Sequence, residues 1–506
     1  MDRRRFLAGS AAMLSVLGHS ADAAPAASKG QQQPFDATVV RALARALAQK
    51  RFKAPDKSLP DNLKNIDYDQ YRSIRFKPEK ALWRGAGLPF QVEFFQRGFI
   101  FEDHVDIYIV EDGKAHLFPY SPDLFDYGLV KPTPADSNVG FAGFRLHAPI
   151  NRPDYYDEVG VFLGASYFRA VAKNQVYGLS ARGLALRTAD STKGEEFPFF
   201  KAFWIEKPAK GTDSIVVHAL LDSESASAAY RFTIRPGDTT IYDVQMALYP
   251  RVEIKEAGIA PLTSMFFFDA NDRVGVDDYR PAVHDSGGLA MRNGHGEELW
   301  RPLINPKDLQ ISIFSDVNPR GFGLMQRERQ FHDYEDLESR FEKRPSLWIE
   351  PIGDWSAGAV YLIEIPSNKE IHDNIVPFWR PHDPLLAKRE YIYTYRMHWG
   401  WGKANPRGLA RFMRTRIGAG PDGTRLFVLS IEGGRLDFSD VKAFKAVFSS
   451  NKGKIKHLVL EPNPVTGGLR VSFQLSTDKE PVIELRGQLM QKDKPVSEVW
   501  MYRWTT

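Results

Sequence analysis

Residues 214–249 read SIVVHALLDSESASAAYRFTIRPGDTTIYDVQMALY, and this stretch decides the fold class. It contains three runs rich in β-branched and aromatic residues, 214–222, 228–234 and 239–249, separated by a Ser-rich turn and by Pro236-Gly237-Asp238. Short apolar runs between such turns are typical of antiparallel strands joined as a meander. The stretch therefore predicts an antiparallel sheet.

The same pattern continues on both sides of this stretch. From about Phe90 onward, short apolar or alternating runs follow one another, for example 105–110 and 115–118 around the turn Asp112-Gly113. Helical periodicity between the strands is scarce, which argues against βαβ units and so against a Rossmann fold or a TIM barrel. We therefore expect an all-β protein built around a large β-sandwich.

One helix is expected before the sheet. Asp36 is a residue type that caps helix N-termini. After it, apolar positions recur at helical spacing: Val39, Val40, Leu43 and Leu47.

A domain boundary is expected at residues 400–408, which are rich in Gly, Pro and basic residues and show no periodicity. This gives a large sandwich over residues 34–400 and a second unit over 409–506. Strands are expected in the second unit at 425–431, 457–461, 469–475, 482–489 and 499–504, which suits a small sandwich of about seven strands, the size of an immunoglobulin-like domain.

The composition excludes several classes of function. The 506 residues carry a net charge of +4, and the basic residues are spread along the chain, so no surface for nucleic acid is indicated. The chain has no cysteine, which excludes disulfides, thiol nucleophiles and Cys-ligated metal sites. Catalysis would have to use carboxylates, His, Ser, Tyr or Lys.

Residues 1–23 resemble an export signal. Arg3-Arg4-Arg5 precede an apolar stretch at 6–18, and Ala21-Asp22-Ala23 forms a cleavage site of the A-x-A type. The run from Arg3 to Leu7 also fits the twin-arginine pattern R-R-x-F-L. No later stretch is apolar and long enough to cross a bilayer, so we expect a soluble protein of the periplasm.

Six of the ten tryptophans fall between residues 300 and 401, among many acidic residues. Aromatic faces stack on sugar rings while carboxylates and Arg bind the hydroxyl groups, so this composition suits a carbohydrate cleft. The alternative is that these rings pack in the cores of the sheets, which is the commoner use of Trp in β-proteins.

Two His-Asp pairs, His284-Asp285 and His372-Asp373, each follow a probable strand end. Hydrolysis of a glycosidic bond needs one carboxyl group as acid and another as base or nucleophile, so Asp285 and Asp373 are candidates. They could instead form Asx turns. One metal held by both pairs is a further alternative, but the ligand spacing is atypical and we expect no metal or other cofactor. A Ser-His-Asp hydrolase lacks its G-x-S-x-G elbow here.

Several motifs together resemble the family of periplasmic glucan biosynthesis proteins G and D, and the twin-arginine signal is more similar to that of the D members. These motifs lie at 89–95, 141–145, 260–266, 279–281, 284–286, 300–303, 318–326, 344–346 and 373–376. The resemblance implies a galactose-mutarotase-like sandwich followed by an immunoglobulin-like domain. It also implies a role in setting the β-1,2-linked glucose backbone of osmoregulated periplasmic glucans, with D-like members resembling inverting endo-β-1,2-glucanases.

The resemblance further assigns roles to residues. The Asp of its His-Asp-Ser motif, Asp285, corresponds to the general base, and the Asp of its Asp-Asn-Ile-Val motif, Asp373, to the general acid. Neighbouring motif residues are expected to line the substrate: Tyr279, Arg280, Trp355 and Trp379.

The implied ligand is linear β-1,2-glucan, with a membrane glucan synthase and a second copy of the chain as partners to be tested. Two alternatives stay open. One is a non-catalytic glucan-binding or scaffold protein that assists backbone synthesis or branching. The other is a mutarotase or a lyase, which is supported only by analogy of fold.

Overall fold

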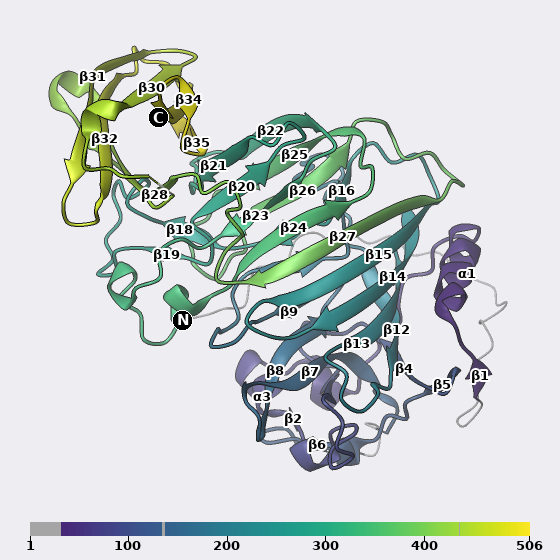
Figure 1. The fold of residues 1–506 in the computed structure, drawn as a ribbon. Helices are drawn as coiled ribbons and strands as arrows, with labels where there is room; N and C mark the ends of the chain where they lie inside the picture. Colours follow the sequence, from purple (N-terminus) through teal and green to yellow (C-terminus); the bar gives the residue numbers. More distant parts are fainter. Residues whose placement is uncertain (1–31, 134–136, 435) are drawn as a thin grey trace. The chain divides into compact units, whose positions relative to one another are not determined.

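The structure is a computed structural model that describes residues 32–133, 137–434 and 436–506, so the expected export signal lies outside the described residues. The chain forms two compact units. Unit 1 comprises Met1–Lys173, Arg182–Ala257 and Pro384–Thr394, and unit 2 comprises Asn174–Ala181, Gly258–Asp383 and Tyr395–Thr506. No helix within the described ranges is both long and apolar enough to cross a membrane. Strands dominate both units (Figure 1), which confirms the all-β prediction.

Unit 1 contains the predicted meander. The antiparallel pairing is continuous, from Ile215 opposite Ile234 to Ala226 opposite Pro250. The turn Asp112-Gly113 has the two positive φ angles of a tight hairpin, 49° and 71°. The strands run in the order β1 (Gln33–Pro34), β5 (Lys114–Leu117), β4 (Asp106–Glu111), β12 (Phe199–Glu206), β13 (Ile215–Asp222), β14 (Ala226–Arg235) and β15 (Thr240–Pro250).

A second sheet of unit 1 packs on the first through phenylalanine rings. Phe162 lies 5.4 Å from Phe203 and 5.3 Å from Phe232, measured between ring centroids. The sheet runs β9 (Tyr167–Ala170), β8 (Tyr155–Leu163), β7 (Phe141–Arg152) and β3 (Gln91–Gln96). Shorter elements are β2 (Arg75–Phe76), β6 (Phe125–Asp126), β11 (Leu184–Leu186), α2 (Asp61–Lys64), α3 (Tyr68–Ser73), η1 (Pro78–Lys80) and η2 (Pro122–Leu124).

The predicted helix is α1 (Ala37–Ala48). The Asp36 side chain accepts a hydrogen bond from Thr38 N–H at 2.7 Å, so the predicted cap is confirmed. The helix buries Val40 and Ala44 against β13, β14 and β15, and Figure 1 shows it, in purple, beside these strands.

Two of the sheets in unit 2 hold most of its strands before residue 400. One sheet runs β24 (Ser346–Ile352), β23 (Gly321–Met325), β20 (Gly288–Arg292), β21 (Glu298–Pro302), β35 (Val499–Thr505), β33 (Val482–Gln491) and β30 (Phe444–Ser450). The other includes β26 (Ile375–Pro381), β25 (Ala357–Glu364) and β22 (Gln310–Val317). Short strands are β10 (Ser180–Arg182), β17 (Leu262–Thr263), β18 (Phe266–Phe268), β19 (Val283–His284) and β34 (Lys494–Pro495), with 3-10 helices η4 (Phe331–Asp333), η5 (Phe341–Lys343), η6 (Pro421–Gly423) and η7 (Val441–Ala443). Along the chain, the division between the units falls within β10 and also within β16 (Ala257–Ile259) and β27 (Tyr391–Gly400).

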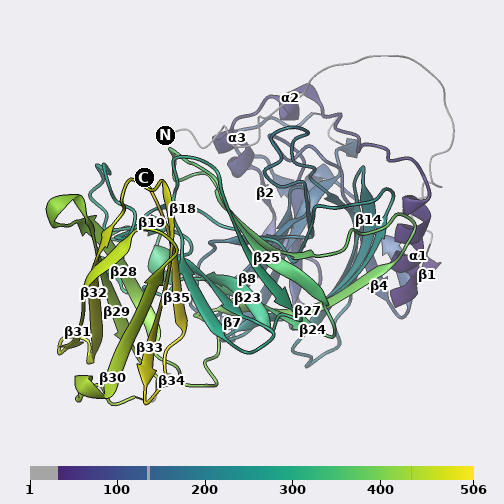
Figure 2. The ribbon, with the colours of Figure 1, turned by 90° about the horizontal axis from the view of Figure 1, so that it is seen from above.

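The C-terminal residues form a small sandwich. Its first sheet is β28 (Arg411–Ala419), β29 (Arg425–Glu432), β32 (Gly468–Ser476) and β31 (Lys454–Asn463). Figure 2 shows this layer facing the layer of β30, β33 and β35. All five strands predicted here are present, and β28, β30 and the short strand β34 are additional.

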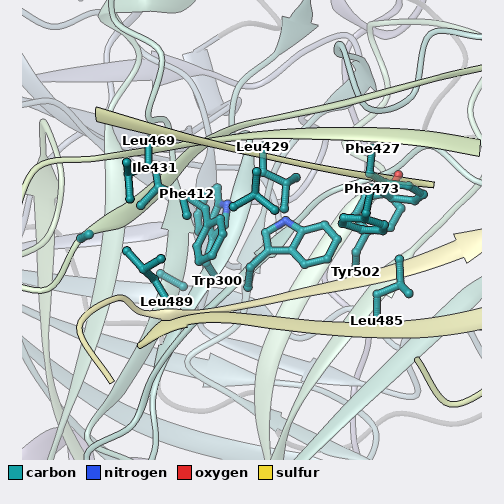
Figure 3. Close-up of a cluster of buried hydrophobic side chains, with 14 of the residues drawn as sticks. Trp300, Phe412, Phe427, Leu429, Ile431, Leu469, Phe473, Leu485, Leu489 and Tyr502 are labelled. Atoms are coloured by element: carbon teal, nitrogen blue, oxygen red, sulfur yellow. The ribbon is translucent and has the colours of Figure 1, made fainter. Parts of the chain in front are cut away.

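The core of this sandwich is shared with earlier parts of unit 2. β21 pairs in parallel with β35, placing Trp300 opposite Trp500. Trp300, Met325 and Trp348 belong to the same buried cluster as the C-terminal aromatic residues, and Figure 3 shows Trp300 among them. The predicted boundary at 400–408 is a loop, but the chain after it packs as one unit with residues 258–383.

Candidate active site

The backbone of Asp285 is held by the segment 262–268. β18 pairs with β19 in the antiparallel sense, with Phe266 opposite His284. Directly after β19, Asp285 N–H donates to Met265 O at 2.9 Å. The candidate base therefore extends from one edge of this segment.

The opposite edge of the same segment holds the backbone next to Asp373. Ser264 and Ile375 exchange two backbone hydrogen bonds of 3.0 Å each. The Asn374 side chain accepts from Phe266 N–H at 2.9 Å. Two aspartates 88 residues apart in sequence, as 373 minus 285, thus flank one segment. Two strand spacings separate their backbones by about 10 Å.

The Asp285 carboxylate is 4% exposed and bears a positive charge directly on it. Arg344 Nη1 donates to Asp285 Oδ1, and Arg344 Nε donates to Ser339 O at 3.1 Å. The guanidinium also lies 4.3 Å from the centroid of the Phe341 ring. These contacts fix Arg344 from three sides, and its charge stabilises the carboxylate form that a general base needs.

The Asp373 carboxyl group is half-buried, and no residue in the described ranges forms a hydrogen bond or ion pair with it. The loop before it is ordered by Ser367, whose Oγ lies 2.9 Å from His372 Nδ1 and donates to Lys369 O. An uncommitted carboxyl group at the end of an ordered loop is suited to contact a ligand.

Tyr279 and Arg280 lie beside each other but differ in availability. The Tyr279 side chain is 79% exposed, so its ring can meet a ligand. Arg280 donates instead to Asp278, Asp336 and Glu370, at 2.7 to 3.0 Å. It therefore joins three loops, including the loop that leads to Asp373, and its donors are already used within the protein.

The two tryptophans expected to line the substrate lie in the core. Trp355 is 3% and Trp379 is 0% exposed, and their rings pack 6.3 Å apart. Because neither ring has a face open to a ligand, the structure corrects the expectation for both: they contribute packing. At these two positions, the alternative that the tryptophans pack in the cores of the sheets is the correct one.

Three residues gather next to the candidate base, and of these only His284 was named from the sequence, as half of a His-Asp pair. Asp269, His284 and Glu328 each direct one metal-type donor atom to a common point, all within 4.8 Å of one another. Burial, supported by the charge of Asp269 and opposed by Arg414, raises the pKa of Glu328 to about 8. Burial also lowers the pKa of His284, against the charges of Asp269 and Asp285, so its ring is neutral at pH 7.

Sequence reasoning missed Asp269 and Glu328 because they come from separate loops and have no regular spacing to His284. Arg344 had one signal, since it opens the motif Arg344-Pro-Ser346, but nothing in that motif pointed to Asp285.

A cavity of about 660 Å³ lies in unit 1, lined by Arg97, His104, Asp106 and Lys201 among others. None of the six predicted site residues lines it. Its size alone does not make it the active site, because the paired acids and their partners all lie in unit 2.

Comparison with known proteins gives a consistent result along most of the chain. The model of the family "Periplasmic glucan biosynthesis protein, MdoG" matches residues 35–504. Glucans biosynthesis protein G of Rhodopseudomonas palustris is 59% identical over 505 residues, and that of Bradyrhizobium diazoefficiens 60% over 507, both covering 100% of either chain. The Vibrio cholerae protein of the same name is 50% identical over 480 residues, 93% of this chain and 87% of that one.

These relatives carry the name of protein G, so they give no support to the likeness to protein D expected from the export signal. Among solved structures, a galactose mutarotase related enzyme from Lactobacillus acidophilus matches 47% of this chain and 95% of its own, at 8% identity and a TM-score of 0.20. A likeness of that degree carries no argument about the site.

Proposed function

This chain belongs to the MdoG family of periplasmic glucan biosynthesis proteins, and from that premise we propose that it cleaves the β-1,2-linked glucose backbone of these glucans as an inverting endo-β-1,2-glucanase. The observation that carries the proposal is the placement of Asp285 and Asp373 on the two edges of segment 262–268. Inverting glycosidases hold their two carboxyl groups roughly 6.5–9.5 Å apart, with a water between one of them and the sugar. A backbone separation of about 10 Å is compatible with that distance.

In the proposed mechanism Asp373 is the general acid. Its uncommitted carboxyl group transfers a proton to the glycosidic oxygen as the bond from that oxygen to the anomeric carbon breaks. The leaving chain departs with a new hydroxyl group, and Asp373 is left as a carboxylate.

Asp285 is the general base in this mechanism. It accepts a proton, directly or through one water, from the water that attacks the anomeric carbon on the opposite face of the ring. Attack from the opposite face inverts the anomeric configuration. Arg344 keeps Asp285 ionised before the step, and both aspartates return to their starting states by proton exchange with solvent.

Tyr279 is the residue we propose to stack on a glucose ring, because its side chain is exposed and lies in the same sequence motif as Arg280. Arg280 supports the site indirectly, because its hydrogen bond to Glu370 holds the loop that leads to Asp373.

The test incubates the mature protein with linear β-1,2-glucan and follows reducing ends and the anomers of the products. We expect shorter chains with inverted anomers, and a loss of at least about 10²-fold in the rate for Asp373→Asn. The matched control is Asp383→Asn, which changes an exposed aspartate whose ion pair is with the neighbouring His382, and it should keep the parent rate.

The second candidate function is a non-catalytic glucan-binding or scaffold protein. The name of the relatives favours it, since they are called biosynthesis proteins and not hydrolases. Saturable glucan binding by the parent without release of reducing ends would support this candidate and contradict the hydrolase. An unsaturated product end absorbing in the ultraviolet would indicate a lyase instead.

A further inference from the structure

Three side chains with metal-binding chemistry meet in unit 2 although they are distant in sequence. Asp269 directly follows β18, His284 ends β19, and Glu328 lies three residues beyond β23. One oxygen of each carboxyl group and one ring nitrogen all lie within 4.8 Å of one another. The three donors thus converge from three different strand ends.

His284 is the member that lacks a full set of partners. Its side chain is 1% exposed, and neither of its ring nitrogens makes a hydrogen bond of good geometry to any residue in the described part of the chain. The nearest carboxylate oxygen to Nε2 is Asp269 Oδ2 at 3.7 Å, beyond hydrogen-bond range. Gln326 is the one side chain of the described residues that acts on the imidazole as a hydrogen-bond partner, so at least one buried ring nitrogen is left without a partner, which costs free energy and marks a position for a ligand.

The space between these donors suits a single ion. A cavity of about 20 Å³ is lined by all three residues, together with Gly287 and Thr415 among others. Tetrahedral Zn²⁺ at about 2.1 Å from its ligands spaces them about 3.4 Å apart. The distance of 3.7 Å between His284 Nε2 and Asp269 Oδ2 is close to this value, and the donor atom of Glu328 lies within 4.8 Å of the other two.

The local charges allow a cation at this point. Arg414 contacts Glu328 through Nε and Asp333 through Nη2. Each carboxylate has two oxygens, so Arg414 can hold one oxygen of Glu328 while the other binds an ion. Arg416 acts on the same carboxyl group only at longer range. Arg327, which also lines the cavity, pairs with Glu498, and Asp269 has no ion pair with an arginine within the described residues.

We propose that Asp269, His284 and Glu328 bind one divalent transition metal ion of the Zn²⁺ class. An imidazole with two carboxylates suits Zn²⁺ or Mn²⁺ better than Ca²⁺ or Mg²⁺, which prefer oxygen ligands alone. Gln326 Oε1, which is buried and likewise unbonded, lies beside the same Gly287 as the imidazole and can accept its second N–H. The ion would tie β19 to Glu328 and so fix the strand end that carries Asp285. The site departs from the expectation of a metal-free protein.

The test measures metal binding directly. The mature protein, purified without a polyhistidine tag and treated with a chelator, is titrated with ZnCl₂ and MnCl₂ by calorimetry. We expect one Zn²⁺ per chain with a Kd on the order of 1 µM or below, and a rise in Tm at saturation. Asp269→Asn and Glu328→Gln should each weaken binding at least about tenfold.

The matched control is Glu342→Gln, another buried glutamate of unit 2, which should bind Zn²⁺ like the parent. Melting curves without metal show whether each variant folds. Gln326→Leu is a further variant: it leaves the three ligands in place but removes the proposed acceptor of the second His284 N–H, so Zn²⁺ binding should weaken. Absence of Zn²⁺ and Mn²⁺ binding, binding of Ca²⁺ or Mg²⁺ alone, or binding that the ligand variants do not weaken would overturn the proposal. Because the experiment measures metal binding and not hydrolysis, its result does not depend on whether the protein cleaves glucan.

Discussion

At the scale of single residues, Arg344 places a positive charge directly against the carboxylate of Asp285, the candidate base. Arg344 lies directly after η5 and contacts Asp285, which precedes it by 59 positions, as 344 minus 285. Its own position is set by Ser339 O and by the Phe341 ring. The residue acts on Asp285 rather than on substrate, which makes it a positioning residue.

We expect Arg344→Gln to lower kcat for glucan release at least about tenfold while leaving KM within about twofold, because Asp285 loses its counter-charge but the glucan contacts stay. Removing one member of a largely buried ion pair should also lower the free energy of unfolding by about 3 kcal/mol. Initial rates over a range of glucan concentrations and a denaturant titration check both values.

The control for this prediction is Arg340→Gln. It removes an arginine of the same loop that pairs with Glu342 and not with Asp285. An unchanged kcat in Arg344→Gln, or an equal loss in the control, would contradict a specific role for the contact with Asp285.

Arg280 acts at the scale of elements, since it joins three loops through Asp278, Asp336 and Glu370. The hydrogen bond from Arg280 lowers the pKa of the Asp278 carboxyl group below its usual 3.8. For Asp336, burial would raise the pKa, but hydrogen bonds from Ser339 N–H and Arg280 outweigh it and lower it. Both carboxyl groups therefore bind protons more weakly when the protein is folded.

The sign of the pH effect follows from these directions. Each pair contributes its full stability above the unfolded pKa of 3.8 and loses it as the pH falls through the lower folded value. We expect Arg280→Met to have a lower Tm than the parent at pH 7, and to lose less Tm than the parent between about pH 5 and pH 3. Thermal melts at several pH values measure this.

Lys307→Met is the control for charge alone, because Lys307 is exposed and has no ion pair within the described residues. It should follow the parent at every pH. Parallel curves for Arg280→Met and the parent would show that the arginine does not hold these carboxylates.

At the scale of the whole molecule, one hydrophobic core in unit 2 contains residues from both sides of residue 408. Trp300 and Trp348 pack in the same cluster as Phe427, Phe473 and Trp500, which lie after residue 408. β21 also has β35 as a strand neighbour. The segment after residue 408 therefore completes the core of residues that precede it.

A chain shortened after residue 408 should lose the native fold of residues 258–383, because Trp300 and Met325 would be exposed and β21 would lose a partner strand. Hydrogen exchange should show loss of protection in β20, β21 and β23. As a milder test, Trp500→Ala in the full chain should cost about 4 kcal/mol, whereas Val465→Ala at an exposed loop should cost almost nothing. Native protection of these strands in the shortened chain would show that residues 409–506 are an independent domain.

Local patterns in the sequence were sufficient to predict several individual strands and the first helix. The meander at 214–249 and the cap at Asp36 were predicted because alternation, turn residues and capping depend on neighbours a few positions away. The export signal at 1–23 lies outside the described residues, so it stays a prediction. The family resemblance is confirmed, while the likeness to protein D finds no support.

The roles of side chains within the site were harder to predict. Trp355 and Trp379 were assigned to the substrate because of their neighbours in the family motifs, but whether a ring lies in a core or on a cleft wall depends on the strands packed over it. Arg280 was assigned to the substrate in the same way, yet its three carboxylate partners come from loops up to 90 residues away.

The sequence by itself determined the all-β class, the meander at 214–249, the five strands predicted after residue 408, the family and the two candidate aspartates, because these depend on local periodicity or on short motifs. Only the tertiary structure decided that Asp285 and Asp373 flank one segment, that Arg344 contacts the first of them, and that Asp269, His284 and Glu328 meet. It also decided that the C-terminal sandwich shares its core with residues that precede it. The physical reason is that these contacts join residues far apart along the chain, whose meeting depends on strand pairing and packing over the whole unit.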